Sequence, residues 1–226
     1  MSNEPTEPRV CLDVIVPNDG FELAMTNMWS NGKRLRVHFL GGSSFLRGKV
    51  KEYAKKWEPH ANITFDFVND PTAEIRVSFI MDGTSWSAVG TDALNTKWFP
   101  EGSATMNYGW LKDNSDEQEF SRVIVHEFGH ALGCIHEHQN PAGGIPWNKD
   151  AVYRYYADRG WDKERVDQNI FRKYELDQSN FSKFDKESIM LYPVPKELTD
   201  GKMEVGWNRN LSKMDKEFMA KKYPKN

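Results

Sequence analysis

Residues 126–136 read His-Glu-Phe-Gly-His-Ala-Leu-Gly-Cys-Ile-His, and this segment constrains the fold and chemistry of the chain more than any other. His126 and His130 are four residues apart, so on an α-helix they project from the same face, one turn above the other. Gly133 follows three residues later, where a glycine can take a positive φ, end the helix and turn the chain. Such a turn would bring His136 toward the same point from another direction.

Three imidazoles that converge in this way favour a zinc ion with an open fourth position, which indicates a catalytic rather than a structural site. We therefore expect one Zn²⁺ ion held by His126, His130 and His136. Glu127 is rotated away from the ligands, where it can take a proton from a zinc-bound water and act as general base and acid. The alternative is a polar helix whose histidines bind nothing, but the extended motif fixes five positions within eleven residues.

A second segment, Ser188-Ile189-Met190-Leu191-Tyr192, is a short apolar run that ends in a tyrosine. Together with the histidine motif it resembles the metzincin zinc peptidases, in which a methionine-containing turn follows later in the chain. The Ser-x-Met-x-Tyr spacing, and Glu137 directly after His136, are similar to the astacin branch of that clan. The resemblance implies that Met190 forms a hydrophobic floor under the zinc. It also implies that Tyr192 ligates zinc at rest and stabilises the oxyanion during turnover.

Without the histidine motif, Met190 would be read as core packing and Tyr192 as a surface anchor. The resemblance extends unevenly, to residues 85–92 and 211–224. Two features depart from typical secreted astacins: two cysteines cannot supply their disulfides, and residues 139–144 lack the arginine- and aspartate-rich continuation of animal members. The cleavage specificity of those members is therefore not transferred to this chain.

The order of the expected elements predicts an α+β fold, a two-lobed catalytic domain of the metzincin type. The upper lobe, to about residue 133, would hold a mixed, mainly parallel sheet with two helices. The lower lobe, residues 134–226, would be mostly irregular with helices, and zinc would lie on the floor of the cleft between the lobes. Residues 1–16 would form an N-terminal segment before one catalytic domain, residues 17–226. Strands are expected at 10–16, 33–40, 63–68, 74–80 and 104–111, and helices at 45–57, 116–132, 149–159, 163–171 and 212–222.

A peptidase has to hold its substrate extended, and an exposed edge strand can do so by pairing with the peptide backbone. The strand at residues 104–111, directly before the zinc helix, is the expected edge. Met106, Tyr108 and Trp110 would then contact a protein or peptide substrate. The alternative is that these three side chains simply pack in the core or on the surface.

The N-terminal segment contains Pro8-Arg9-Val10-Cys11, which is similar to the Pro-Arg-Cys switch of some latent metzincins. A thiolate is a good zinc ligand, so Cys11 could occupy the water position and keep the enzyme latent. Asp13 is a rival, because astacin-like proenzymes more often use an aspartate. The third possibility is that Cys11 is a small hydrophobic residue within a first strand.

Composition narrows the remaining functions. The net charge of −3 argues against a nucleic-acid or anionic-membrane partner, since both require a basic face, and no apolar run is long enough to span a bilayer. The N-terminus lacks a classical secretory signal, so we expect a cytoplasmic protein or one exported by a signal-independent route. The expected protein is a monomeric zinc endopeptidase. A zinc hydrolase of non-peptide amides and a catalytically silent binding module are the alternatives.

Overall fold

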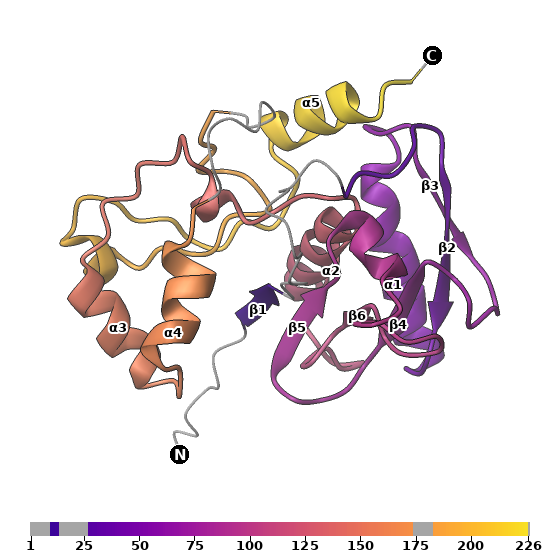
Figure 1. Cartoon of the computed structure of the whole chain (residues 1–226), viewed down its shortest axis with the longest axis horizontal. Helices are drawn as coiled ribbons and strands as arrows, with labels where there is room; N and C mark the ends of the chain where they lie inside the picture. Colours follow the sequence, from indigo (N-terminus) through magenta and orange to yellow (C-terminus); the bar gives the residue numbers. More distant parts are fainter. Residues whose placement is uncertain (1–9, 14–26, 174–182, 226) are drawn as a thin grey trace.

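A six-stranded sheet forms one half of the molecule (Figure 1), in the order β1-β5-β6-β4-β2-β3. The computed structural model describes residues 10–13, 27–173 and 183–225 of the chain. β5 runs antiparallel to β6, and every other neighbouring pair in this sheet is parallel. The strands are β1 (Val10–Asp13), β2 (Arg34–Phe39), β3 (Thr64–Phe67), β4 (Ile75–Ser78), β5 (Thr84–Ser87) and β6 (Met106–Asn107).

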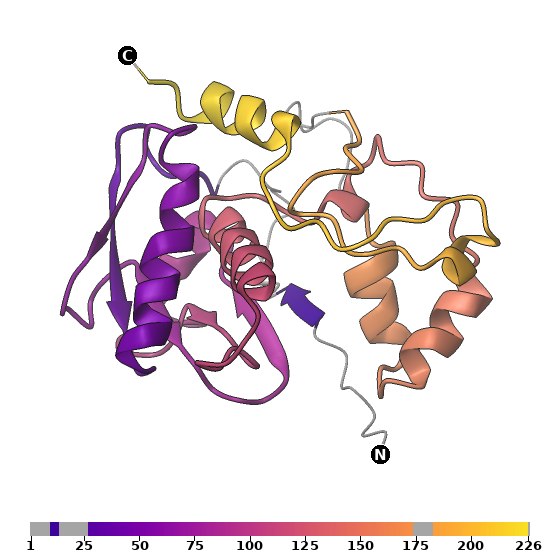
Figure 2. The same ribbon diagram turned by 180° about the vertical axis from the view of Figure 1, so that it is seen from behind.

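Two long helices, α1 and α2, pack against each other and against this sheet, whereas α3 and α4 lie on the far side of β1 (Figures 1 and 2). The sheet with α1 and α2 is therefore one lobe, and the chain after α2 builds the other. The helices are α1 (Ser44–Ala54), α2 (Glu117–Ala131), α3 (Lys149–Ala157), α4 (Lys163–Val166) and α5 (Lys213–Lys222). Short turns of other helix types are η1 (Lys55–Trp57), η2 (Gly90–Leu94), η3 (Glu137–Gln139), η4 (Asp167–Phe171) and η5 (Lys196–Thr199).

Helix α2 begins and ends where its sequence favours it. Asp116 caps the N-terminus by accepting a hydrogen bond from the backbone amide of Gln118, and acidic residues occupy the first turn, where they complement the helix dipole. At the other end Gly133 has φ of 99°, a conformation that few other residues adopt. Its amide donates to the carbonyl of His130, which closes the last turn. The chain therefore leaves the helix sharply after the second histidine.

The C-terminal helix α5 returns to the sheet lobe. Tyr223, at its end, is buried, and its hydroxyl donates to the carbonyl of Leu132 at 2.8 Å. The backbone amide of Trp29 donates to the same hydroxyl at 3.2 Å. Residues near the end of the chain thus hold in place the turn that follows α2. In the described part of the chain, no helix is both long and apolar enough to cross a bilayer.

The α+β, mainly parallel architecture with two covering helices is as predicted, but one strand was missed. β5 lies where the sequence predicted a loop, because its two inward-facing positions are Ser85 and Ser87 rather than apolar residues. The strand expected at 104–111 is reduced to β6, which lies between β5 and β4 in the sheet. The prediction that this segment forms an edge is therefore wrong.

Candidate metal centre and active site

The three histidines of the motif converge on one point between the lobes. Their Nε2 atoms form a nearly regular triangle, with separations of 3.1 Å from His130 to His126, 3.1 Å from His130 to His136 and 3.2 Å from His126 to His136. A tetrahedral zinc ion with bonds of about 2.05 Å holds two nitrogen ligands about 3.3 Å apart. The spacing of the imidazoles therefore fits zinc.

The tautomers of the imidazoles are set by hydrogen bonds on their outer sides. Nδ1 of His126 donates to the carbonyl of Ile189 at 2.8 Å, and Nδ1 of His130 donates to the carbonyl of Cys134 at 2.8 Å. A neutral imidazole carries one N–H, so the Nε2 atoms of both rings present lone pairs to the centre. Converging lone pairs repel one another unless a cation lies between them, which is a second sign that the site is built for a metal.

Burial keeps these rings neutral. His126 is 7% exposed and His136 is fully buried. Burial lowers the pKa of both side chains well below the usual value, and the neighbouring imidazoles lower each pKa further. Neutral imidazole is the form that binds a metal ion, so a metal does not first have to displace a proton from these rings.

Glu127 and Cys11 meet at the open side of the histidine triangle. The Cys11 thiol donates to Oε2 of Glu127 at 3.3 Å, and its Sγ lies 3.6 Å from Nε2 of His130. A thiolate and an imidazole on one tetrahedral zinc ion stand about 3.6 Å apart. The ligand atoms of Cys11 and the three histidines all lie within 4.8 Å of one another. The described residues thus offer four ligands rather than three.

The segment with Met190 lies beneath the zinc helix. Met190 is 3% exposed, and its Sδ would be only 2.4 Å from a Cβ placed on Gly129, within the histidine motif. The amide of Glu137 donates to the carbonyl of Met190 at 3.0 Å. The segment therefore contacts the motif both in the helix and after it.

Asp215 at the start of α5 holds this segment in place. Its carboxylate accepts hydrogen bonds from the hydroxyl of Ser188 at 2.7 Å, from the amide of Ile189 at 2.9 Å and from the amide of Ser212 at 2.9 Å. Ile189 in turn supplies the carbonyl that orients His126. A single residue, Ile189, therefore connects Asp215 to His126 through its backbone amide and carbonyl.

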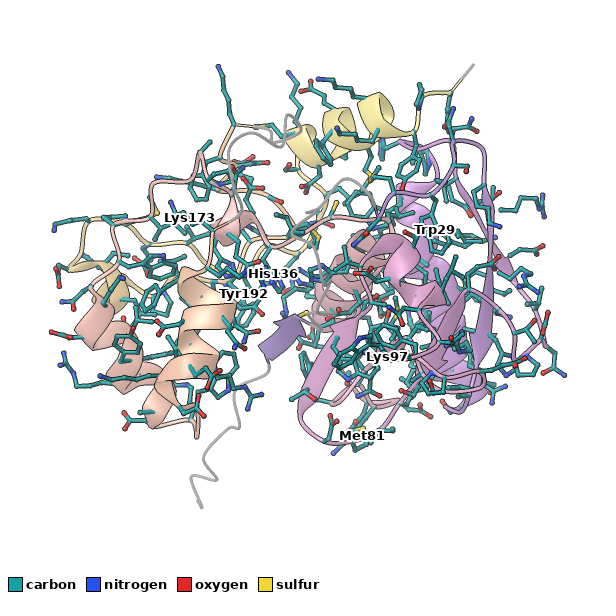
Figure 3. All side chains as sticks on the ribbon, in the orientation of Figure 1. Trp29, Met81, Lys97, His136, Lys173 and Tyr192 are labelled. Atoms are coloured by element: carbon teal, nitrogen blue, oxygen red, sulfur yellow. The ribbon has the colours of Figure 1, made fainter. Side chains whose placement is uncertain are left out.

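Tyr192 lies at the centre of the site, beside His136 (Figure 3). Its ring centroid is 4.4 Å from that of His136 and 4.6 Å from that of His138. Its hydroxyl donates to the backbone carbonyl of Cys11. The phenol is thus next to the metal centre and is engaged by the N-terminal strand, while its predicted role as a zinc ligand stays a prediction.

The N-terminal strand covers the outer edge of β5. β1 pairs with β5 in parallel, and Cys11 stands opposite Ser85 in the register. Pairing of the backbone thus sets the position of the thiol over the histidines. The backbone of Asp13 pairs with Ser87. The side chain of Asp13, the rival latch, lies outside the described residues, as do residues 1–9 and 14–16 of the expected N-terminal segment.

The three residues predicted to contact substrate from an edge strand separate in the structure. Met106 and Tyr108 are fully buried, because β6 is an inner strand. Burial, followed by the charges of Glu127 and Cys11, raises the pKa of the Tyr108 phenol well above its usual value. Trp110 is half-buried and lines a cavity beside Glu127.

This cavity, of about 430 Å³, opens from His126 and Glu127 toward the second lobe. Its wall includes Arg122, Arg159 and Trp207, which sequence reasoning did not single out. Arg122 precedes His126 by four residues on the same helix, so the spacing could have revealed it. No sequence signal pointed to the other two: Trp207 lies in irregular chain, and Arg159 lies in the turn directly after α3, at the end of the helix expected at 149–159.

Comparison with known proteins agrees with this geometry. The matrixin family model matches residues 43–155. One solved structure of myroilysin is 45% identical, with 90% of this chain and 98% of that chain covered and a TM-score of 0.86. A second myroilysin structure is 41% identical, with 98% and 94% covered and a TM-score of 0.73.

A more distant structure shares the fold alone. The hatching enzyme HCE-1, a zinc-protease from the medaka fish Oryzias latipes, is 14% identical, with 92% of this chain and 100% of that chain covered and a TM-score of 0.61. A search of curated protein sequences finds no match.

Proposed function

The chain belongs to the metzincin zinc metallopeptidases, and from this premise we propose that it is an astacin-like zinc endopeptidase whose N-terminal strand keeps it latent. The observation that carries the proposal is the triangle of Nε2 atoms, with the ring of Tyr192 beside His136 and with Glu127 on the same helix as two of the imidazoles. The astacin branch is supported by the Ser188-to-Tyr192 segment, in which the tyrosine lies beside His136. The substrate is a protein or peptide.

His126, His130 and His136 would hold the ion. When bound, zinc would supply a Lewis acid for the scissile carbonyl and would lower the pKa of the attacking water. Glu127 takes the proton from that water and delivers it to the leaving amine, which is general base and then general acid catalysis. The hydroxyl of Tyr192, once released from Cys11, donates a hydrogen bond to the developing oxyanion.

Latency is supported by three contacts of one residue. The thiol of Cys11 lies against Glu127 and His130, its carbonyl engages Tyr192, and its backbone pairs with β5. The base, the oxyanion donor and the sheet edge would all be withheld from a substrate. Cys11 also packs with apolar residues of the second lobe, as the small-hydrophobe alternative requires, but that alternative does not explain its polar neighbours.

Replacing the base tests the chemistry. In the Cys11→Ala background, in which the proposed latch is removed, Glu127→Gln should reduce cleavage of unfolded casein by at least about a hundredfold, because general base catalysis contributes about 10²–10⁴. Zinc content, measured by elemental analysis, should stay at one ion per chain. Substantial residual cleavage by the metal-loaded variant would contradict the assignment of Glu127. Activity on small amides but not on casein would favour the non-peptide hydrolase, and no hydrolysis at all would favour a binding module.

Replacing Cys11 tests the latch. Cys11→Ala should raise the rate of casein cleavage by the full chain, and cleavage of the chain after residue 16 should raise it further, because that cut also removes the backbone contacts of Cys11 with Tyr192 and β5. An unchanged rate in both proteins would favour simple packing of the thiol. Loading the protein with Co²⁺ gives a readout that does not depend on activity. A thiolate ligand produces a strong near-ultraviolet absorption band, which should be present in the native chain and absent from Cys11→Ala.

A further inference from the structure

Trp207 is a large aromatic side chain that remains 47% exposed at the wall of the active-site cavity. Exposed tryptophans are not unusual by themselves, and Trp98 is 43% exposed without lining this cavity. Trp207 differs because the same cavity contains His126 and Glu127. A substrate side chain beside the scissile bond would enter the space that the indole faces.

The indole is held in place by the zinc helix. The guanidinium of Arg122 lies 4.0 Å from the centre of the Trp207 ring, well within the range of a cation–π contact. Arg122 is itself fixed by Glu119, which accepts from its Nε at 3.0 Å and from Nη2 at 2.6 Å. Glu119 also accepts from the indole nitrogen of Trp110 at 2.8 Å. One carboxylate and one guanidinium therefore fix two aromatic rings at the cavity.

The backbone on both sides of Trp207 is fixed as well. The side chain of Asn208 donates to the carbonyl of Ser188 at 2.8 Å, and the hydroxyl of Ser121 donates to the carbonyl of Arg209 at 2.8 Å. An exposed apolar ring that is already ordered loses little conformational entropy when a ligand covers it. Such a ring is well suited to binding.

The charges around the ring favour an apolar occupant over an acidic one. Glu119 neutralises Arg122, with side chains that are 16% and 14% exposed. Arg159, which also lines the cavity, donates to the carbonyl of Tyr155 at 2.7 Å and lies 3.5 Å from the centre of its ring. Among the described residues no carboxylate pairs with Arg159, but its guanidinium is covered by that ring. The remaining lining is mainly aromatic and aliphatic.

We propose that Trp207 is a specificity-determining residue, which contacts a bulky apolar side chain of the substrate next to the scissile bond. This inference rests on the proposed peptidase function and adds a substrate class to it. A cavity of about 430 Å³ accommodates a side chain as large as phenylalanine.

The test compares a phenylalanine and an alanine peptide that differ only in one residue beside the scissile bond, with each flanking position tried in turn, and an aspartate peptide of the same sequence measures any preference for an acidic residue. All variants carry Cys11→Ala in the full chain. Trp207→Ala should lower kcat/KM for the phenylalanine peptide by roughly 10- to 100-fold and change it less than about threefold for the alanine peptide. Trp207→Phe should restore most of the loss, and the matched control Trp98→Ala should change neither value.

A second measurement separates binding from turnover. In the Glu127→Gln background, anisotropy of the labelled phenylalanine peptide should show weaker binding when Trp207→Ala is added. Equal losses for both peptides would overturn the proposal, as would a parent that prefers aspartate and is unaffected by Trp207→Ala, which would assign selectivity to Arg159. If neither the parent nor the same chain cleaved after residue 16 acts on the peptides or on casein, the peptidase function fails, and this proposal fails with it.

Discussion

Gly129 is a glycine inside the zinc helix, and replacing it by alanine sets two effects of opposite sign against each other. In a helix interior alanine is more favourable than glycine by about 1 kcal/mol. A Cβ at this position would, however, lie 2.4 Å from Sδ of Met190 and 3.1 Å from Cζ2 of Trp57. Overpacking of a core costs about 1–3 kcal/mol. We therefore expect Gly129→Ala to lower the free energy of unfolding by about 0–2 kcal/mol.

The neighbours cannot easily move away. Met190 is 3% exposed and Trp57 is 1% exposed. The indole nitrogen of Trp57 also donates to the carbonyl of Val125 at 2.9 Å, which fixes the ring. Met190 therefore has to shift, and with it Ile189, whose carbonyl orients His126. Zinc affinity, measured by competition with a chromophoric chelator, should fall together with stability.

Gly48 is the matched control. It is exposed in the middle of α1, and a Cβ there would meet no atom within 4 Å. Gly48→Ala should raise the free energy of unfolding by about 0.5–1 kcal/mol and the melting temperature by about 1–4 °C, since only helix propensity changes. Urea denaturation of both variants tests the reasoning. If Gly129→Ala stabilises the protein as much as Gly48→Ala does, the contact with Met190 is not a constraint.

Three other predictions concern the site and its supports. Tyr192→Phe in a Cys11→Ala background should lower kcat for peptides by about 100-fold at unchanged zinc content, because one oxyanion donor contributes about 10²–10³; an unchanged kcat would exclude this role. Asp215→Ala leaves the buried amides of Ile189 and Ser212 without their acceptor, so it should cost about 2–4 kcal/mol in urea denaturation. Burial raises the pKa of Asp92 from 3.8 to about 6, so the folded state binds more protons than the unfolded state. Stability should then fall as pH rises from about 4 to 6, and Asp92→Asn should remove this slope.

The parts of the site that lie close together in the sequence were the ones that the sequence could predict. On a helix, a spacing of four residues converts directly into a shared face, so the positions of His126 and His130 followed from the motif. A glycine at Gly133 predicted the turn, and φ of 99° confirms it. Trp207 reaches the cavity from irregular chain, where no periodicity relates sequence to position. Arg159 lies just after α3, and its place at the cavity depends on how the two lobes pack together.

The position of Cys11 in the site could not be predicted from local sequence patterns. Its thiol contacts Glu127 across 116 residues of sequence, and that contact depends on the pairing of β1 with β5. The sequence did not predict β5, because serines rather than apolar residues fill its buried face. Their small size nevertheless allows the neighbouring chain to pack closely against the strand. The hydroxyl of Ser85 accepts a hydrogen bond from the amide of Gly109 at 3.1 Å, at a point where a Cβ on Gly109 would lie 2.1 Å from the carbonyl oxygen of Thr84. The small side chains let the chain after β6 pass close to β5 on one side, and β1 pairs with the outer edge of β5 on the other. The proposed latency would therefore depend on this sheet edge, which the histidine motif alone cannot encode.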